Sequence, residues 1–344
     1  MLANFKKVSV AAAVAAALGA SGAAQAVIES YPGDALLIPY VATNGAGRLN
    51  TMISVVVASP TTVNVSQFPT LTGPKTTDGC KGEIHWYFFD KSSIEIVDDK
   101  IPVTCDDWVG IDFGSIVEAK KLPSALNVPG YMVITDAKAS GTTASNMILY
   151  GAAYQIRGNW ATQAYIPVLP MIDDVDSASR DEVKHKDASF LSNVNPVTAG
   201  MLLADEPGEG SAFSMRYFLQ STDPAGSTEF VLWFPDNSDL RESQTVLVFD
   251  KDERAISART SIPYELNVLK VADDAAVGGL YTGVIKDGLA DTGFVLFDVV
   301  DFDEDASTVN GYGSRAGVAF SLIGVDGAIG EQTQTELAHE RGVQ

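Results

Sequence analysis

Residues 80–113 (CKGEIHWYFFDKSSIEIVDDKIPVTCDDWVGIDF) hold both cysteines of the chain and its clearest strand–turn–strand pattern. From 83 to 89, bulky side chains fill both sets of alternating positions, which is typical of a strand covered on both faces. The polar run 90–93 interrupts this strand and residues 94–97 resume it, as in a β-hairpin. This hairpin is the feature that most limits how the chain can fold.

With Ser92 and Ser93 as a two-residue turn, the pairing runs outward until Cys80 faces Cys105. Facing cysteines satisfy the Cα separation of roughly 4.4–6.8 Å that a disulfide requires. The polar residues 98–100 would then lie in mid-strand, which demands a bulge or a corner. A three-strand meander is the alternative, and it would separate the cysteines. We favour the hairpin and predict a disulfide between them.

The first 26 residues resemble a secretory signal, with Lys6 and Lys7 ahead of an apolar run and a small-residue site ending at Ala26. The apolar run is shorter than the ~20 residues of a membrane span. We therefore expect cleavage after Ala26 and export to the periplasm, the outer cell surface or the extracellular medium. No later run is long and apolar enough to span a membrane, so the mature chain should contain no span.

The chain has a formal charge of −21, and loss of the two signal lysines would take it to −23. Such a field repels nucleic acids and anionic membranes, so we expect no nucleic-acid partner. Two cysteines in an exported chain most often form one bridge. Hydrophobic residues make up 46% of the chain, which is enough for a folded core.

Many short apolar runs are separated by turns rich in Pro, Asn and Asp, and 116–122 is the best candidate for a short helix, which Pro123 would end. The polar segment 173–187 is either an exposed helix or a loop. The sequence predicts an all-β protein, an antiparallel β-sandwich with few short helices. The run 52–57 (MISVVV) suggests a strand buried on both faces. We expect a first β-sandwich region over 27–172, a second over 173–330, and a polar tail over 331–344. One large sandwich spanning both regions is the alternative.

Two pairs of segments suggest relationships. HWYFFDKSS in the first half looks like VLWFPDNS in the second, but no fixed period links them, so duplication stays a hypothesis. LLIPY followed by NTMISVV, and TEFVLWFP followed by VLVFDKDE, resemble uncharacterised exported proteins of proteobacteria. That resemblance implies export and a β fold. The family has no assigned activity, so it implies no site residue.

Catalytic patterns are sparse. The histidines are His85, His185 and His339, and the sequence contains no H-E-x-x-H, C-x-x-C or G-x-S-x-G. We expect His85, inside an aromatic strand, to be a hydrogen-bonded core residue. The acids Asp106 and Asp107 beside a tryptophan suggest a glycosidase pair, which needs a separation of roughly 5–10 Å. Acids in turns are more often solvated or capping, and we predict no enzymatic activity.

Two candidate binding sites remain. Trp86 and Trp233 lie in apolar strands and should be core residues, whereas Trp108 and Trp160 border polar turns and are candidate ligand contacts for sugar stacking. In the acidic stretch 298–310, alternating carboxylates resemble the start of a calcium loop. These are Asp301, Asp303 and Asp305. Ala306 and Tyr312 depart from the EF-hand pattern, so these carboxylates would bind calcium at a site of another kind. Calcium is the one cofactor that we consider.

Together these features predict an exported, non-catalytic β-sandwich protein with a structural or adhesive role at the cell surface. Its partners would be a protein or a glycan there, or other copies of itself. A glycan-binding module is the main alternative, and an acid-pair polysaccharide hydrolase is the third.

Overall fold

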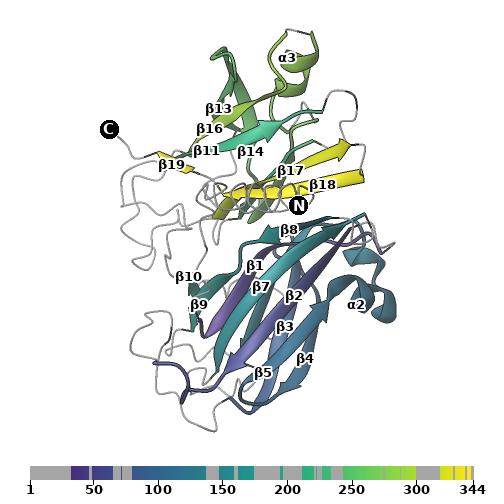
Figure 1. Ribbon diagram of the computed structural model, residues 1–344, viewed down its shortest axis with the longest axis vertical. Coiled ribbons are helices and arrows are strands. Elements are labelled where there is room, and N and C mark those ends of the chain that lie inside the picture. Colours follow the sequence, from purple (N-terminus) through teal and green to yellow (C-terminus); the bar gives the residue numbers. More distant parts are fainter. Residues whose placement is uncertain are drawn as a thin grey trace, which may run out of the picture. The chain divides into compact units, whose positions relative to one another are not determined.

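The computed structural model describes residues 32–45, 49–64, 71, 80–136, 147–158, 162–173, 194–196, 211–220, 222, 227–233, 243–273, 276–286, 288–299, 318–327, 330–337 and 339–341. Within these ranges the chain forms four antiparallel β-sheets and two short α-helices (Figure 1). The predicted all-β, antiparallel sandwich class is confirmed.

The first half contains β1 (Ala35–Val41), β2 (Leu49–Ala58), β3 (Gly82–Asp90), β4 (Glu95–Val103), β5 (Asp107–Asp112), α2 (Phe113–Lys120), the 3-10 helix η2 (Pro123–Ala125), β6 (Gly130–Asp136), β7 (Ile148–Arg157), β8 (Thr162–Ile166), β9 (Leu169–Asp173) and β10 (Val194–Pro196). The second half contains β11 (Ser211–Phe218), β12 (Glu229–Trp233), β13 (Ser243–Asp250), β14 (Ala255–Ser261), β15 (Leu266–Lys270), α3 (Leu280–Lys286), β16 (Thr292–Val299), β17 (Val318–Gly327), β18 (Gly330–Leu337) and β19 (His339–Arg341).

The sheets pack in pairs around two hydrophobic clusters. Sheets β10-β9-β1-β6-β3-β4 and β5-β2-β7-β8 enclose the first cluster, where the rings of Phe88 and Phe113 lie 4.5 Å apart. Sheets β14-β13-β16-β11-β19 and β15-β12-β17-β18 enclose the second, where Phe230 meets Phe297 edge to face at 5.6 Å. Burial of these apolar side chains is the main force that holds each pair of sheets together.

The two halves share one topology. Adding ten to each strand number converts β9-β1-β6-β3-β4 into β19-β11-β16-β13-β14, and β5-β2-β7-β8 into β15-β12-β17-β18. The helices also correspond, because α2 lies between β5 and β6 and α3 lies between β15 and β16. Among the strands that the structure describes, β10 has no counterpart. The second half therefore repeats the strand order of the first.

Two glycines align the halves residue by residue. Gly130 of β6 pairs with Asp90, and Gly293 of β16 pairs with Asp250. A Cβ atom at either glycine would overlap the backbone of the facing strand, so glycine is required at both. The structure thus aligns HWYFFDKSS with TVLVFDKDE (245–253). The structure does not align HWYFFDKSS with VLWFPDNS, because residues 231–233 of VLWFPDNS belong to β12, the counterpart of β2.

Two threonines align the second pair of sheets. The Oγ1 of Thr51 accepts a hydrogen bond from the backbone N–H of Ala42 at 2.9 Å and donates one to the carbonyl of the same residue at 3.0 Å. The Oγ1 of Thr228 does the same with Phe218, at 2.8 Å and 3.0 Å. Counting on from these threonines matches the five residues of β12 with residues 52–56 of β2.

The β3–β4 hairpin has the predicted register from Gly82 opposite Val103 to Phe88 opposite Val97. Its turn is longer than predicted, because the register shifts after Phe88 and Ser93 adopts a left-handed conformation with φ 59°. The bulge expected at 98–100 is wrong, since these residues pair regularly with β3. They tolerate mid-strand positions because β4 is an edge strand, with one side open to solvent.

Strand β2 is buried on one face only. Ile53, Val55 and Val57 are buried, whereas Val56 is 36% exposed. The expectation that β2 is buried on both faces is wrong. Apolar residues also occupy its outer, partly exposed face, and composition does not distinguish that face from the buried one. The helix begins earlier than predicted, at Phe113, because the Asp112 carboxylate caps it by accepting the Ser115 N–H.

Sheet β15-β12-β17-β18 is buried on both faces. Phe230 and Leu232 point into the second cluster, whereas Val231 and Trp233 belong to the first cluster. We call the outer set the junction face, since it joins the second half to the first. Its members are Val231, Trp233, Leu266, Val318, Phe320 and Leu322, each at most 1% exposed.

Candidate functional site

Trp108 is the most exposed large apolar side chain among the described residues, at 64%. Its indole Nε1 donates a hydrogen bond to Ser54 Oγ, 3.0 Å away on the neighbouring strand β2. A Cβ atom built on Gly110 would lie 2.9 Å from Cη2 of the indole, so the six-membered ring covers that glycine. The indole therefore lies along the sheet surface, held at one end by Ser54, with its opposite side open to solvent.

Further apolar side chains continue from Trp108 across the outer surface of sheet β5-β2-β7-β8. Val56 pairs with Trp108 and with Tyr150, and Tyr154 meets Tyr165 edge to face with ring centroids 5.8 Å apart. Tyr154 is 37% exposed. We call this surface the aromatic face; it comprises Met52, Ser54, Val56, Trp108, Gly110, Tyr150, Ala152, Tyr154 and Tyr165.

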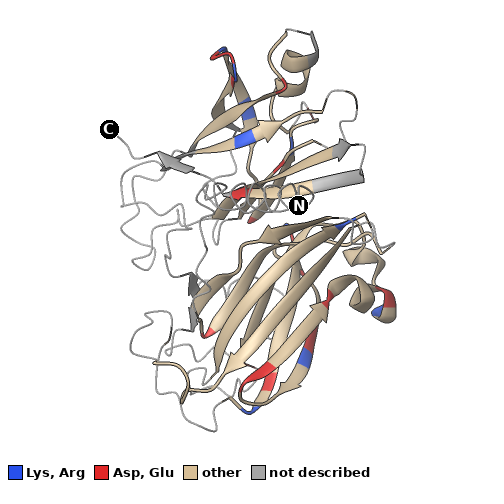
Figure 2. Cartoon of the chain, viewed as in Figure 1, with Lys and Arg blue, Asp and Glu red and all other residues tan. Residues whose placement is uncertain are grey.

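The aromatic face carries little charge. Strand β2 has no charged residue and β7 has only Arg157, at its end (Figure 2). Burial raises the pKa of Tyr150 and of Tyr165, so both phenols are neutral at physiological pH. Contiguous exposed apolar surface on a folded protein commonly marks a binding site. Of the two tryptophans predicted to contact a ligand, Trp108 lies at the edge of the aromatic face. Trp160 lies outside the described residues.

The acid pair beside Trp108 is engaged in turn contacts. The Asp106 carboxylate accepts the Ser59 N–H at 2.9 Å. That of Asp107 accepts the N–H of Thr104 at 3.1 Å and of Trp108 at 2.9 Å. These are the capping contacts expected of acids in turns.

The predicted disulfide is present. Cys80 and Cys105 are bonded, with their Cα atoms 4.9 Å apart, at the open end of the β3–β4 hairpin. It closes the end of the hairpin opposite the turn. The bridge also decides against the three-strand meander.

His85 is buried at 7% exposure and hydrogen-bonded on both nitrogens, as expected of a core histidine. Its Nε2 lies 2.7 Å from the Asp98 carboxylate, and its Nδ1 is hydrogen-bonded to the Tyr87 hydroxyl. Burial lowers the pKa of His85 despite the opposing effect of Asp98. Trp86 and Trp233 are core residues, as predicted.

Asp301, Asp303 and Asp305, the predicted calcium ligands, lie outside the described residues. Among the residues that are described, no group of three or more His, Cys, Asp or Glu side chains is arranged to hold a metal ion. No helix in the described part of the chain has the length and apolar character to cross a membrane.

Comparison with known proteins places the chain in no family. No protein family and no curated protein matches the sequence. Among solved structures, the apo form of a Pleurotus ostreatus lectin aligns with 91% of this chain and 76% of its own, at 9% identity and a TM-score of 0.18. A likeness at that score supports no conclusion.

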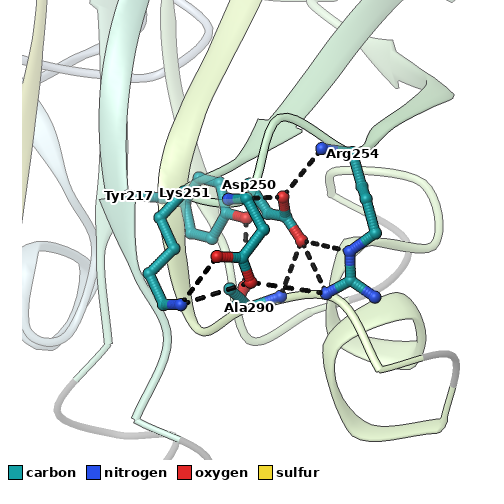
Figure 3. Close-up of polar contacts among 6 residues, drawn as sticks. Tyr217, Asp250, Lys251, Arg254 and Ala290 are labelled. Atoms are coloured by element: carbon teal, nitrogen blue, oxygen red, sulfur yellow. Dashed lines mark hydrogen bonds and ion pairs between the residues drawn. The ribbon is translucent and has the colours of Figure 1, made fainter.

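The structure also shows a buried carboxylate that sequence reasoning missed (Figure 3). Asp250, at 3% exposure, ends β13. Its Oδ1 accepts the N–H groups of Asp252 and Arg254, each at 2.9 Å. Its Oδ2 accepts the Ala290 N–H at 3.0 Å and lies 2.9 Å and 2.8 Å from two guanidinium nitrogens of Arg254.

Burial by itself would raise the pKa of Asp250, but these donors outweigh it and lower the pKa from 3.8 to about 2. Because both oxygens are engaged, Asp250 serves the hairpin and the adjoining loop rather than a ligand. No local pattern signals this burial, because the tripeptide Phe-Asp-Lys occurs at 89–91 and again at 249–251 and only the second aspartate is buried.

Proposed function

We propose that this is an exported, non-catalytic protein with a structural or adhesive role at the cell surface, and that it acts through the aromatic face. The observation that carries the proposal is the exposed indole of Trp108, held along the sheet by Ser54 and Gly110 beside further apolar side chains. Aromatic side chains of this kind supply much of the binding energy at protein surfaces. The disulfide supports export, since such bonds persist in oxidising compartments.

The test is binding of the purified mature protein to isolated cell envelopes of the source bacterium. Wild type should be retained after washing, and Trp108→Ala should be retained much less, because the substitution removes the largest exposed apolar surface. Ile94→Ala is the matched control, since Ile94 is 53% exposed on the β3–β4 turn, outside the aromatic face. Equal retention of wild type and Trp108→Ala would contradict the proposal.

Glycan binding is the second candidate, favoured by the orientation of the same indole. A ring lying along a sheet with one side open offers the planar apolar surface on which the apolar face of a sugar stacks. On a glycan array, wild type should bind a defined set of glycans, Trp108→Ala should lose them and Trp108→Phe should retain part of the signal. Turnover of a polysaccharide by the purified protein would contradict both candidates and support the hydrolase alternative.

A further inference from the structure

We infer that copies of this chain associate head to tail, with the aromatic face of one copy covering the exposed end of the second half of the next. This inference rests on the proposed function and names the partner of its aromatic face. It follows from the repeated topology, because the contact that joins the two halves within one chain has counterparts on both sides of it that are partly exposed among the described residues.

The contact within the chain is apolar at its centre and polar at its rim. On the junction face, Trp233 meets Tyr131 at the start of β6 edge to face, with ring centroids 5.8 Å apart. The guanidinium of Arg157, at the end of β7, lies 3.3 Å from the Glu229 carboxylate. The amine of Lys91, on the β3–β4 turn, lies 4.2 Å from the Tyr264 ring centroid. The second half thus docks on one end of the first.

The aromatic face is the first-half counterpart of the junction face. The threonine alignment places Val56 at the position of Trp233, and the strand partners of these two residues then place the others. The matched pairs are Val56 with Trp233, Trp108 with Leu266, Tyr150 with Val318, Ala152 with Phe320, and Tyr154 with Leu322. In the junction these positions are buried, whereas Val56, Trp108 and Tyr154 are 36%, 64% and 37% exposed. The exposed apolar side chains of the first half therefore occupy junction positions.

The surface that would receive this face is the second-half counterpart of the end of the first. We call it the acceptor end, and it comprises Lys251, Phe294 and Val325, the counterparts of Lys91, Tyr131 and Arg157. Val325 is 37% exposed, the Lys251 side chain is 58% exposed and Phe294 is half-buried. Val325 thus gives this end an exposed apolar side chain too.

The two open surfaces match each other in chemistry. Where the junction pairs the charges of Arg157 and Glu229, the counterparts are the apolar Val325 and Met52, so both members of the pair change together. The ring pair of Trp233 and Tyr131 becomes Val56 and Phe294. The cation and ring of Lys91 and Tyr264 become the opposite charges of Asp106 and of Lys251, whose amine also lies 3.0 Å from Asp252 of its own chain. Each contact has a compatible replacement, which is the complementarity that a repeated interface needs.

The two surfaces are different, so the contact is heterologous. In a pair of copies, one keeps a free aromatic face and the other keeps a free acceptor end. Further copies can therefore add into an open chain, unless the rotation between successive copies closes a ring. Copies that each carry a charge near −23 also repel one another. Association should therefore strengthen with added salt, which screens that repulsion while leaving the apolar contact intact.

The test is sedimentation velocity of the mature full-length protein over a range of concentrations, at low and at moderate sodium chloride. Wild type should form a concentration-dependent series of oligomers that grows with salt. Val56→Glu and Val325→Glu should each be monomeric, because each blocks one of the two surfaces. Mixing the two variants should give a dimer and nothing longer, since one intact surface remains on each. Leu247→Glu is the matched control, at 40% exposure outside both surfaces, and should behave as wild type.

Circular dichroism and thermal melting verify that every variant folds. Should a valine variant fail to fold, Trp108→Glu replaces Val56→Glu on the aromatic face and Lys251→Glu replaces Val325→Glu on the acceptor end. Both of these side chains are mostly exposed. A wild type that stays monomeric at every concentration and salt overturns the inference. If the monomeric wild type still binds envelopes or glycans in a way that depends on Trp108, the proposed function holds although the inferred association does not. Oligomers that persist in Val56→Glu, or a mixture that forms no dimer, also overturn it.

Discussion

Asp90 and Asp250 occupy the same position in two hairpins whose backbone hydrogen bonds are the same. The N–H of Asp90 donates to the Ile94 carbonyl and that of Asp250 to the Arg254 carbonyl, each at 2.9 Å. Each carboxylate also accepts the backbone N–H groups two and four residues later. The two differ in surroundings, because only Asp250 is buried and bonded to a second loop through Ala290.

That difference predicts unequal costs of removal. Asp250→Ala leaves three part-buried N–H donors and the half-exposed Arg254 guanidinium without this acceptor, so the free energy of unfolding should fall by roughly 2–3 kcal/mol. Asp90→Ala exposes its donors to water and should lower it by only about 1 kcal/mol. Urea unfolding of the two variants and wild type measures both values. Equal losses would show that burial at Asp250 contributes nothing.

The duplication explains how far the sequence could predict the fold. The hairpin register followed from alternation and from the cysteine positions, both of which are local. The turn did not, because Ser93 in a left-handed conformation adds one residue that alternation does not reveal. The repeat is hard to see in the sequence because its matches are short and far apart, such as Phe-Asp-Lys at 89–91 and 249–251 and a glycine followed by an aromatic residue at 130–131 and 293–294. Pairing across the sheet is needed to see that they correspond.

The sequence predicts only part of the candidate site, because local patterns do not show which face of a strand is exposed. Trp108 stood out because polar turns border it, and the structure places it on the surface. The sequence does not identify Val56 and Tyr154 as surface residues, because an apolar residue that faces outward looks the same in sequence as one that faces the core. The burial of Asp250 cannot be predicted from nearby residues, because it depends on Ala290, forty residues later in the chain.

Acid should remove the contribution of Asp250 in a defined range. Its pKa is about 2 in the folded protein, against about 3.9 for an unfolded aspartate. The unfolded chain therefore binds more protons between these values, so the stabilisation is complete above about pH 4 and is lost as the pH falls towards 2. Asp250→Asn carries no charge at any pH. The difference in unfolding free energy between wild type and this variant should be constant from neutrality to about pH 5 and shrink below about pH 4. A difference that stays constant down to about pH 3 would contradict the assignment.

The disulfide should stabilise the first half measurably. The bonded cysteines are 25 residues apart, and on the chain-entropy model closing such a loop contributes about 3.5 kcal/mol. The double variant Cys80→Ser/Cys105→Ser should lose about that amount in urea unfolding, or less if the reduced chain retains structure. Intact mass of the protein alkylated without reductant should show no modified cysteine. Two alkylated cysteines in protein isolated from the cell would refute the bond.

Cations should raise the melting temperature through the acidic stretch that contains Asp301, Asp303 and Asp305. Three alternating carboxylates in a chain of strong negative charge concentrate repulsion, and a hard cation bound by their oxygens removes it. Binding to the folded state stabilises it by mass action, by about 2.7 kcal/mol at a hundred times the dissociation constant. Screening alone acts alike for all salts at equal ionic strength. Melting in calcium, magnesium and matched sodium chloride separates the two, with Asp303→Asn as the variant and Asp273→Asn, an exposed aspartate on the turn after β15, as its control. A calcium-selective rise that only Asp303→Asn removes supports the site, and equal shifts in all salts reduce the effect to screening.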